Sequence, residues 1–458
     1  MNSLNREELA RQIWHAGVAA VDARQLVRHS LRIDAGALWV GPRSYPLATL
    51  GSVEIVGTGK AGAGMVRGAL DLLAPALPPG QLSGWVNVPA DCVGLTPPVV
   101  LHPARPAGLN EPTAAGVAGA TEILARVARL GPRDLCLVLL SGGGSALLPA
   151  PAPGLSLADK QAVTRVLMQS GATIHELNTV RKQLSAIKGG GLARAIRAGH
   201  TETLIISDVV GDPLDIIASG PTVPDTGSPA AALAVLDRLG VRPPAIPPHV
   251  FTWLQQKAVD QPTSPAPTTT LHNTLIGRNQ TALAASAAAA TAAGCDVLDL
   301  GSNNTGEATE VGQALARLAR EQQASRGPNR PPLCLLSGGE PVVRLPPASD
   351  RGLGGRNQQL ALAALIEWYF ATEDFPAANS ATPAPVLLSG GTDGEDGPTD
   401  AAGAIASLEI ARRARDLQLD PHQFLRRCDA WHFFDRCGGL LKTGPTHTNV
   451  MDLRVVIV

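Results

Sequence analysis

Aromatic residues are scarce in this chain, at 3% of its 458 residues. The formal net charge is −1, and lysine and arginine form no long basic run. Proteins that bind nucleic acids usually present a basic face, and those that bind single strands also stack bases on aromatic side chains. The composition therefore argues against a nucleic-acid partner.

Long apolar runs are also missing. No stretch of about 20 large apolar residues is available to cross a membrane. The nearest candidate, residues 282–293, consists mostly of alanine and predicts a packed helix. Residues 1–11 are polar and charged, unlike a secretory signal. We expect no membrane segment and a cytoplasmic location.

Several motifs that would define an enzyme class are absent. The six cysteines contain no Cys-x-x-Cys pair, and Cys136 and Cys334 lie inside apolar runs, which predicts reduced core residues. The ten histidines form no zinc-binding pattern. There is no Gly-x4-Gly-Lys-Ser/Thr loop, no protein-kinase motif set and no Gly-x-Ser-x-Gly elbow. These absences argue against P-loop enzymes, protein kinases, zinc enzymes and serine hydrolases.

Hydrophobic residues are plentiful instead, at 45%, and three apolar runs share one ending. The sequence Leu-Leu-Ser-Gly-Gly closes the runs at residues 135–143, 333–339 and 386–391. A continuous apolar run predicts a central strand that is buried on both faces, and open α/β sheets bind ligands beyond the carboxyl ends of their strands. We interpret the three endings as ligand-binding loops. The alternative is that these glycines only form tight turns.

A fourth glycine loop, Gly-Thr-Gly-Lys-Ala-Gly at residues 57–62, joins a predicted strand to a predicted helix. This order matches the Gly-x-Gly-x-x-Gly fingerprint of dinucleotide-binding folds. An acidic residue should close the next strand, but that strand, residues 84–88, runs into Pro89. Lys60 is the better indication, because a cation beside helix-terminal N–H groups suits a phosphate or a carboxylate.

Cations accompany two further glycine-rich turns. The predicted helix at residues 174–187 carries Arg181 and Lys182, and it leads through Lys188 into three glycines. Arg356 opens another helix directly behind glycines. Several cations on one helix are often only a solvated face. The adjoining glycines favour an anion site instead.

Acidic residues gather after two of the predicted strands. Asp208 and Asp212 follow the strand at residues 203–206, and Asp393 and Asp396 follow the third Ser-Gly-Gly copy. Mg²⁺ prefers carboxylates together with the phosphate oxygens of a substrate, although aspartate is also common in turns. These four residues are therefore candidate metal ligands.

The length predicts two or three domains. Prolines cluster at residues 243–244, 247–248 and 262–267, which is typical of a connection between domains. We predict an N-terminal domain of residues 1–242, a proline-rich connection of residues 243–270 and a C-terminal domain of residues 271–458. We also predict domain closure about the connection.

Glycine backbones, cations at helix starts and clustered aspartates supply what phosphoryl transfer needs, namely positioning, charge neutralisation and metal bridging of phosphates. The chain also resembles one known family, the glycerate 2-kinases of the DUF4147 type whose C-terminal half is called the MOFRL domain. The matching motifs follow one another along nearly the whole chain, at residues 57–61, 141–146, 178–190, 207–212, 219–222, 337–340, 354–358, 391–397 and 444–450. His447 departs from the pattern, since the family commonly has glycine there.

The resemblance implies an α/β fold with two domains, the first Rossmann-like with a parallel sheet, and an active site in the cleft between them. It implies ATP- and Mg²⁺-dependent phosphoryl transfer to the 2-hydroxyl of D-glycerate, which gives 2-phosphoglycerate and ADP. By similarity, the catalytic candidates are Lys60, Arg356 and Asp208. Lys60 would hold the substrate carboxylate or the transferring phosphoryl group, and Arg356 would clamp the same anion with its forked guanidinium.

The resemblance also implies two sets of binding residues. The nucleotide-binding candidates are Ser141, Gly142, Gly143, Gly144, Ser145, Lys182, Gly338, Gly339 and Glu340. The metal candidates are Asp208, Asp212, Asp393 and Asp396. One of these aspartates is expected to accept the hydroxyl proton, and the sequence does not separate that role from metal binding.

Two alternatives stay open. Members of the family have also been called hydroxypyruvate reductases, so an NAD(P)H-dependent reductase is the second interpretation, and residues 57–62 are its local support. A binding protein for small anions is the third, and the acidic loop around Asp393 argues against it. The expected partners are D-glycerate and a nucleotide, without nucleic acid or membrane. The sequence leaves a homodimer open and does not determine the oligomeric state.

Overall fold

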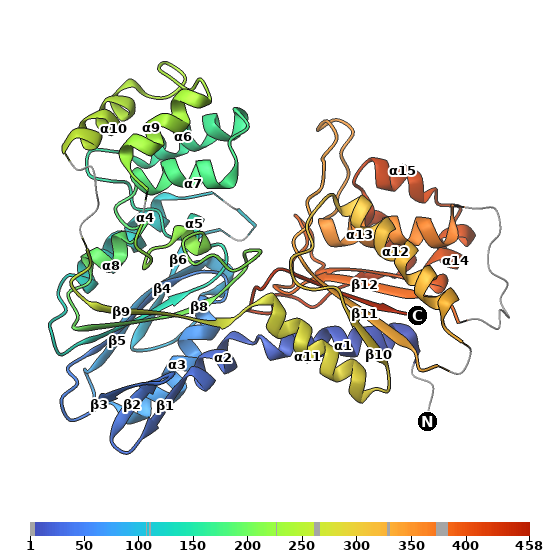
Figure 1. Ribbon diagram of the computed structural model, residues 1–458, viewed down its shortest axis with the longest axis horizontal. Coiled ribbons are helices and arrows are strands. Elements are labelled where there is room, and N and C mark those ends of the chain that lie inside the picture. Colours follow the sequence, from blue (N-terminus) through green and yellow to red (C-terminus); the bar gives the residue numbers. More distant parts are fainter. Residues whose placement is uncertain are drawn as a thin grey trace. The chain divides into compact units, whose positions relative to one another are not determined.

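The computed structural model describes residues 5–106, 108–109, 111–225, 227–260, 266–327, 330–371 and 383–458. The chain divides into two compact units. We call Ala23–Gly277 the parallel-sheet unit, and Met1–Asp22 together with Arg278–Val458 the mixed-sheet unit. Figure 1 labels the elements of both, and each unit is described by itself.

The main sheet of the parallel-sheet unit has the strand order β6-β5-β4-β7-β8-β9, and every neighbouring pair is parallel. The strands are β4 (Val53–Thr58), β5 (Leu82–Pro89), β6 (Val99–Arg105), β7 (Leu135–Leu140), β8 (His200–Ile206) and β9 (Thr270–Gly277). The chain winds outward from β4 to one edge and then from β7 to the other. Ligands bind where such an order reverses. The predicted parallel sheet is confirmed.

Strands β4 and β7 are buried along their whole length, as continuous apolar runs predict. Their backbones approach closely at Gly57, where a Cβ atom would lie 2.2 Å from the carbonyl oxygen of Leu139. No side chain fits in that space. The first glycine of the 57–62 loop is therefore required by strand packing.

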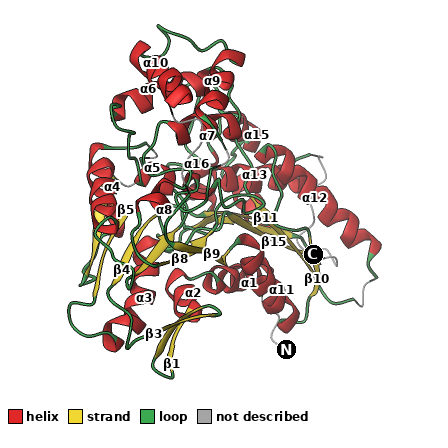
Figure 2. Ribbon diagram, turned by 60° about the vertical axis from the view of Figure 1, so that its left-hand side comes forward, coloured by secondary structure: helices red, strands yellow, loops and turns green. Residues whose placement is uncertain are grey.

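The helices of the parallel-sheet unit form two groups. Those that lie near the sheets are α2 (Ala23–Ser30), α3 (Gly62–Ala76), α4 (Ala114–Val127), α5 (Gly144–Leu147) and α8 (Gly191–Ala195). The others are α6 (Leu157–Gln169), α7 (Ile174–Gln183), α9 (Pro229–Arg238) and α10 (Pro248–Asp260), which gather at one end of the unit around a core of their own (Figures 1 and 2). A small antiparallel sheet consists of β1 (Leu31–Asp34), β2 (Ala37–Val40) and β3 (Arg43–Pro46).

The proline-rich segment lies inside the parallel-sheet unit, which differs from the predicted connection. Pro248 begins α10, where proline's fixed φ suits the first helical turn, and Val250 and Leu254 are buried in the helical core. Residues 270–277 form β9, which pairs with β8. Residues 261–265 lie outside the described residues. The unit ends at Gly277, and the predicted closure about the segment stays a prediction.

The mixed-sheet unit contains the first helix, α1 (Arg6–Ala20), although the chain then enters the other unit. Its sheet has the order β10-β11-β15-β12-β13-β14. The strands are β10 (Asp296–Asp299), β11 (Leu333–Gly339), β12 (Val386–Gly391), β13 (Gly403–Ala406), β14 (Leu440–Leu441) and β15 (Asp452–Ile457). Only β10 and β11 are parallel neighbours.

Helices cover both faces of this sheet (Figure 1). On one face, α1 and α11 (Asn279–Ala292) pack on Leu336 and Leu388, with Trp14 fully buried between them and the strands. The other face carries α12 (Ala308–Ser325), α13 (Arg356–Tyr369), α14 (Leu408–Asp416), α15 (Pro421–Arg426) and α16 (Ala430–Cys437). Alternate residues of β11 and β12 serve the two cores, as strand geometry requires.

Strand β15 lies between β11 and β12, antiparallel to both and in equal register with them. The two later Ser-Gly-Gly copies are therefore related across β15. Residues at the same level of β11, β15 and β12, in that order, are Ser337, Arg454 and Ser389. The next levels are Gly338, Leu453 and Gly390, and then Gly339, Asp452 and Gly391. Both copies are buried on two faces, but in a mixed sheet.

Two expectations about the whole chain are met within the described residues. All six cysteines are buried and free of disulfides. None of the described helices has the length and apolarity that a bilayer crossing requires.

Candidate active site

The loops after β4 and β7 are joined by hydrogen bonds at the point where the strand order reverses. The N–H of Lys60 donates to the carbonyl of Gly142 (2.8 Å), and the N–H of Ala61 donates to Oγ of Ser141 (3.1 Å). The N–H of Ser141 donates to the carbonyl of Thr58 (3.0 Å). Two loops that the sequence predicts separately are thus one structure.

Four consecutive backbone donors lie in this structure. Within the described residues, the N–H groups of residues 142–145 have no hydrogen-bond acceptor. Gly143 has φ +74°, and a Cβ atom there would have no neighbour nearer than 3.4 Å. Successive N–H groups in such a turn form a concavity that binds anions. The donors therefore fit the oxygens of a phosphate.

Two cationic side chains flank the loop. The place a Cβ on Gly143 would take lies 3.4 Å from Cγ of Lys60 and 3.6 Å from Nη2 of Arg105. Arg105 ends β6 and is 4% exposed. Sequence reasoning missed Arg105, because the apolar pattern predicts a strand over residues 99–102 only and Arg105 lies beyond it. The available signal was a cation shortly after an apolar strand, as at Lys60.

Lys182 and Lys188 have different kinds of partner. Nζ of Lys182 lies 3.2 Å from Asp215 and 3.6 Å from Asp225, so its charge is balanced by carboxylates. Lys188 instead donates to Ser145 in the anion loop. The nucleotide-binding role of Lys182 stays a prediction, and Lys188 is the lysine that contacts the anion loop.

Lys160 is a buried cation near these residues, and its Nζ donates to the carbonyl of Leu184 (3.0 Å). Burial, assisted by the positive charge of Arg181, lowers the pKa of Lys160 to about 7. The unfolded chain keeps the ordinary value near 10.4. Below pH 7 the amine is charged in both the folded and the unfolded state, so the folded state carries the full penalty. The penalty shrinks as the pH rises from about 7 to about 10.

We therefore expect Lys160→Met to raise the free energy of unfolding by about 2 kcal/mol at pH 6. The gain should fade as the pH approaches 10, and urea denaturation of both proteins across pH 6–10 measures it. The carbonyl of Leu184 keeps the N–H of Ala152 as a donor. Lower stability of the variant at pH 6 would contradict the electrostatic interpretation.

Asp208 and Asp212 follow β8, the strand next to β7, and both lie in the turn that begins at Ser207. Asp212 has φ +56°, in the left-handed region. No group of three or more histidine, cysteine, aspartate or glutamate side chains in the described part of the chain is arranged to hold a metal ion. Mg²⁺ usually takes one or two protein carboxylates and completes its shell with phosphate and water, which a pair of aspartates can satisfy.

In the mixed-sheet unit, Arg356 opens α13 as predicted, but its fork is engaged. Its Nε and Nη2 donate to the two carboxylate oxygens of Asp452 (2.7 and 2.9 Å), and Nη1 lies 3.1 Å from Glu340. Asp452 is fully buried, and Nη2 of the buried Arg454 lies 3.6 Å from it. Arg356 was predicted to hold a substrate anion with its forked guanidinium, but the fork binds Asp452 instead. Sequence reasoning missed Asp452.

The two acids of the third Ser-Gly-Gly copy differ in role. The carboxylate of Asp396 accepts the N–H groups of Asn357 (3.0 Å) and Gln358 (2.9 Å) and so caps α13. Burial raises the pKa of Asp396 to about 7, although these N–H groups oppose the shift. Oδ1 of Asp393 accepts the N–H of Glu395 (3.1 Å). Asp396 thus positions the helix that begins with Arg356, and Asp393 is the better metal candidate of the two.

The glycines of the second copy are enclosed by protein. A Cβ atom on Gly338 would lie 1.6 Å from Oδ1 of Asn279, and one on Gly339 would lie 2.2 Å from the carbonyl of Asn304. Their contacts are with packed backbone and side chain, unlike the open surroundings of Gly143. Their predicted role in nucleotide binding stays a prediction.

His447 has φ +58°, a conformation that favours glycine. The position is therefore one that suits the glycine of the resembling family. The loop around it is tied to the acidic turn, since the N–H of Thr446 donates to the carbonyl of Asp393 (3.1 Å).

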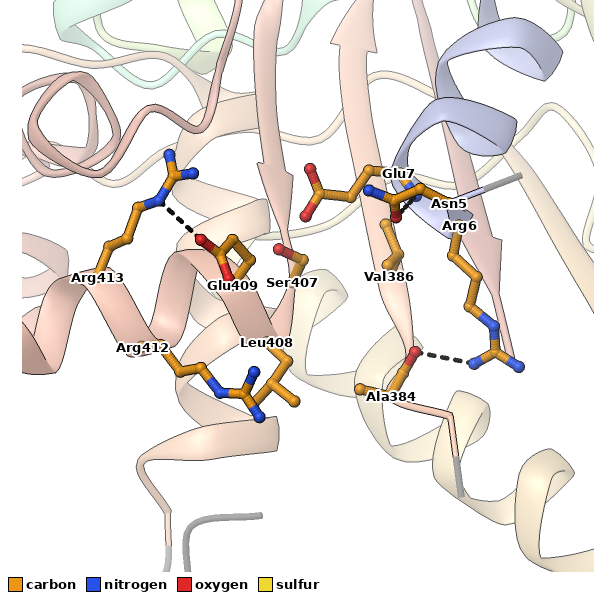
Figure 3. Close-up of a pocket in the computed structure, with 10 residues that line it drawn as sticks. All are labelled: Asn5, Arg6, Glu7, Ala384, Val386, Ser407, Leu408, Glu409, Arg412 and Arg413. Carbon is orange, nitrogen blue, oxygen red and sulfur yellow. Dashed lines mark hydrogen bonds and ion pairs between the residues drawn. The ribbon is translucent and has the colours of Figure 1, made fainter. Parts of the chain in front are cut away.

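A separate pocket in the mixed-sheet unit lies between the start of α1, the start of β12 and α14, and none of the predicted site residues lines it (Figure 3). Its charges are partly matched: Arg413 donates to Glu409 (3.1 Å), and Arg6 donates to the carbonyl of Ala384 (2.8 Å). The pocket offers no arrangement suited to phosphoryl transfer.

Comparison with known proteins places these features in a family. Residues 9–255 match "Domain of unknown function (DUF4147)", and residues 333–452 match the "MOFRL family". Glycerate kinase of Bos taurus is 38% identical over 502 residues, which cover 98% of this chain and 93% of that protein. D-glycerate 2-kinase of Thermotoga maritima is 34% identical over 418 residues, covering 91% of this chain and 93% of the relative.

A protein named hydroxypyruvate reductase in Agrobacterium vitis is 37% identical over 463 residues, covering 100% of this chain and 95% of the relative. The crystal structure of glycerate kinase from Thermotoga maritima has a TM-score of 0.81 and 32% identity, and 99% of each chain is covered. These similarities confirm the predicted resemblance and the α/β fold. The chain therefore belongs to the glycerate kinase family, in which a DUF4147 region is followed by a MOFRL region.

Proposed function

We propose that the chain is a glycerate 2-kinase, which transfers the terminal phosphoryl group of ATP to the 2-hydroxyl of D-glycerate. The products are 2-phosphoglycerate and ADP. The observation that carries the proposal is the row of four N–H groups at residues 142–145, beside Lys60 where the strand order reverses. Donors fixed in this way match phosphate oxygens and need no reorganisation during the reaction.

Three residues have distinct proposed roles. Lys60 neutralises charge on the transferring phosphoryl group, since its side chain lies over the loop. Asp208 accepts the proton of the 2-hydroxyl while the substrate oxygen bonds to phosphorus and the bond from phosphorus to the ADP oxygen breaks. Arg356 contributes a fixed positive charge, because Asp452 holds its fork in one orientation.

Magnesium is expected to bind one or two of Asp208, Asp212 and Asp393, and the phosphates supply its remaining ligands. When bound, Mg²⁺ would supply positive charge that offsets the negative charge of the phosphates.

The name of the relative from Agrobacterium vitis makes hydroxypyruvate reduction the second candidate function. A dinucleotide site of this fold needs an acidic residue at the end of the second strand, where it binds the ribose. The corresponding strand, β5, ends in Val88 and Pro89. Lys60, inside the glycine loop, suits a phosphoryl donor better than a nicotinamide cofactor.

One assay separates the two functions. Purified protein is incubated with D-glycerate, ATP and Mg²⁺, and in parallel with hydroxypyruvate and NADH. We expect ADP release that depends on D-glycerate, and a product that phosphorus NMR identifies as 2-phosphoglycerate. NADH oxidation without ADP release would overturn the proposal, and 3-phosphoglycerate as product would overturn the assigned position of transfer.

A further inference from the structure

Lys188 lies in the interior of the parallel-sheet unit, with 3% of its surface exposed. Its Nζ is 3.1 Å from both the carbonyl oxygen and Oγ of Ser145, and 3.3 Å from Oγ of Ser219. The two serine hydroxyls are 2.6 Å apart. A buried amine is therefore joined directly to the residue that ends the row of free backbone N–H groups.

Ser219 reaches this position through an unusual turn. Ala218 and Ser219 have φ values of +51° and +62°, and residues with a Cβ atom rarely adopt this region because it is strained. Ser219 is fully buried, and its Oγ also lies 3.4 Å from Oδ1 of Asn178. The backbone thus holds the second hydroxyl against Lys188 at an energetic cost.

The charge around Lys188 is positive. Lys160 on α6 and Arg181 on α7 both act on its pKa, and together with burial they lower that pKa well below its usual value. Among the described residues, none of these three cations has a carboxylate within ion-pair distance. The neighbouring acids, Asp215 and Asp225, pair with Lys182 instead. Such buried charge is costly, so the two lysines lose their protons readily until an anion compensates the charge.

We propose that Lys160, Arg181 and Lys188 form a charge reservoir behind the 142–145 loop for a dianionic phosphoryl group, and that Lys188 acts on this group through Ser145 and Ser219. The ligand contacts the four N–H groups and the Ser145 hydroxyl, while Lys188 is a positioning residue behind them. This inference rests on the proposed function, in which the loop binds phosphate. It adds that the loop selects the dianionic form of the phosphoryl group.

A dianion fits better than a carboxylate because three cations without ion pairs lie behind one loop. The terminal phosphate of a nucleotide, the phosphate of 2-phosphoglycerate and inorganic phosphate share this chemistry. Binding should also raise the proton affinity of Lys188, because a nearby negative charge favours the ammonium form. The protein is therefore expected to take up a proton from solution when the phosphoryl group binds.

Isothermal titration calorimetry at pH 8, in two buffers of different ionisation enthalpy, measures affinity and proton uptake together. The ligands are ADP with Mg²⁺, 2-phosphoglycerate, inorganic phosphate and D-glycerate. Comparison of the three phosphate ligands identifies which source of the phosphoryl group uses the site. We expect the full-length protein to take up a fraction of one proton with at least one of them, and none with D-glycerate.

Lys188→Met should weaken the responsive phosphate ligand by about 30-fold, which corresponds to about 2 kcal/mol. It should also lower the proton uptake to the share that Lys160 contributes. Lys188→Arg keeps a permanent charge, so it should restore much of the affinity without restoring uptake. Ser219→Ala should weaken the same ligand about fivefold, and it serves as the test if Lys188→Met does not fold. Lys257→Met is the matched control, because Lys257 is another lysine that donates to a backbone carbonyl. Its acceptor is Gln183 at the end of α7 (3.0 Å), and within the described residues Ser145 and Ser219 are not among its partners.

Unchanged affinity and proton uptake in Lys188→Met, or in Ser219→Ala if that variant replaces it, would overturn the inference. Proton uptake with D-glycerate alone would also overturn it, because the site would then select a carboxylate. These outcomes are separate from failure of the proposed function. Direct binding needs no turnover, so a protein that lacks glycerate kinase activity would still show whether the reservoir exists.

Discussion

Lys60→Met is expected to lower kcat/KM for D-glycerate by about 10³-fold, which is about 4 kcal/mol of transition-state stabilisation. Lys60 is the one cation in the loop between β4 and α3, and its backbone is fixed by Gly142. Methionine keeps the length of the side chain and removes the charge. The loss should appear mainly in kcat, because charge on the phosphoryl oxygens changes most in the transition state.

Steady-state assays of ADP release measure this effect, and two variants accompany them. Arg67→Met removes one positive charge from the exposed side of α3 and should keep kcat within about twofold, because exposed charges are screened. Lys60→Arg keeps the charge with different geometry and should recover only part of the activity. Normal turnover in Lys60→Met would mean that the transferring group lies elsewhere.

Asp452→Asn is expected to lower the free energy of unfolding by about 3–5 kcal/mol, because it removes the buried carboxylate that compensates the charges of Arg356 and of the fully buried Arg454. The carboxylate is fully buried and receives two hydrogen bonds from the fork of Arg356. Asparagine has the same size, but it is neutral and turns an N–H₂ group toward a guanidinium. Arg454, fully buried on the same strand, loses the nearby negative charge as well.

Urea denaturation monitored by tryptophan fluorescence measures this loss. Glu340→Gln is the control, since Glu340 contacts the same arginine but its side chain is 43% exposed; the expected cost is about 1 kcal/mol or less. A loss in Asp452→Asn as small as in the control would contradict the importance of the buried pair. Activity should fall in parallel, because Arg356 would no longer be held in one orientation at the start of α13.

The expected gain in stability from Lys160→Met and the expected loss of phosphate affinity from Lys188→Met have one physical origin. Both lysines are buried among cations, and burial lowers the pKa of each. The burial of positive charge destabilises the folded chain, and a bound dianion would relieve this destabilisation by attraction to the charges. Stability and ligand affinity are therefore expected to oppose each other at this site.

Some predictions needed only local patterns. The runs before Ser141, Ser337 and Ser389 are apolar throughout and form buried strands, because both faces of each strand are covered. The loop around Lys60 lies between β4 and α3, as its glycines indicate. These features depend on residues close together in sequence, so periodicity and turn chemistry are sufficient to place them.

Other features could not be read from local patterns. The second and third Ser-Gly-Gly copies look like parallel strands, but β15 lies between them and runs antiparallel to both. Asp452, on that strand, accepts both hydrogen bonds from the guanidinium of Arg356, which the sequence analysis expected to bind the substrate. Helix α1 belongs with the C-terminal strands because Trp14 is buried against them. Each of these features depends on which distant segments pack together, and the identity of an apolar residue does not specify which residue it packs against.

The sequence by itself determined the family, the three Ser-Gly-Gly loops, the glycine loop at residues 57–62, and which cations and acids lie near them. Tertiary structure alone decided which cation has a partner. Lys182 and Lys188 lie six positions apart, yet Asp215 and Asp225 neutralise the first, and the second reaches the anion loop through Ser145. Charge type is a property of a residue, whereas its free energy depends on burial and on neighbours that only the fold brings close.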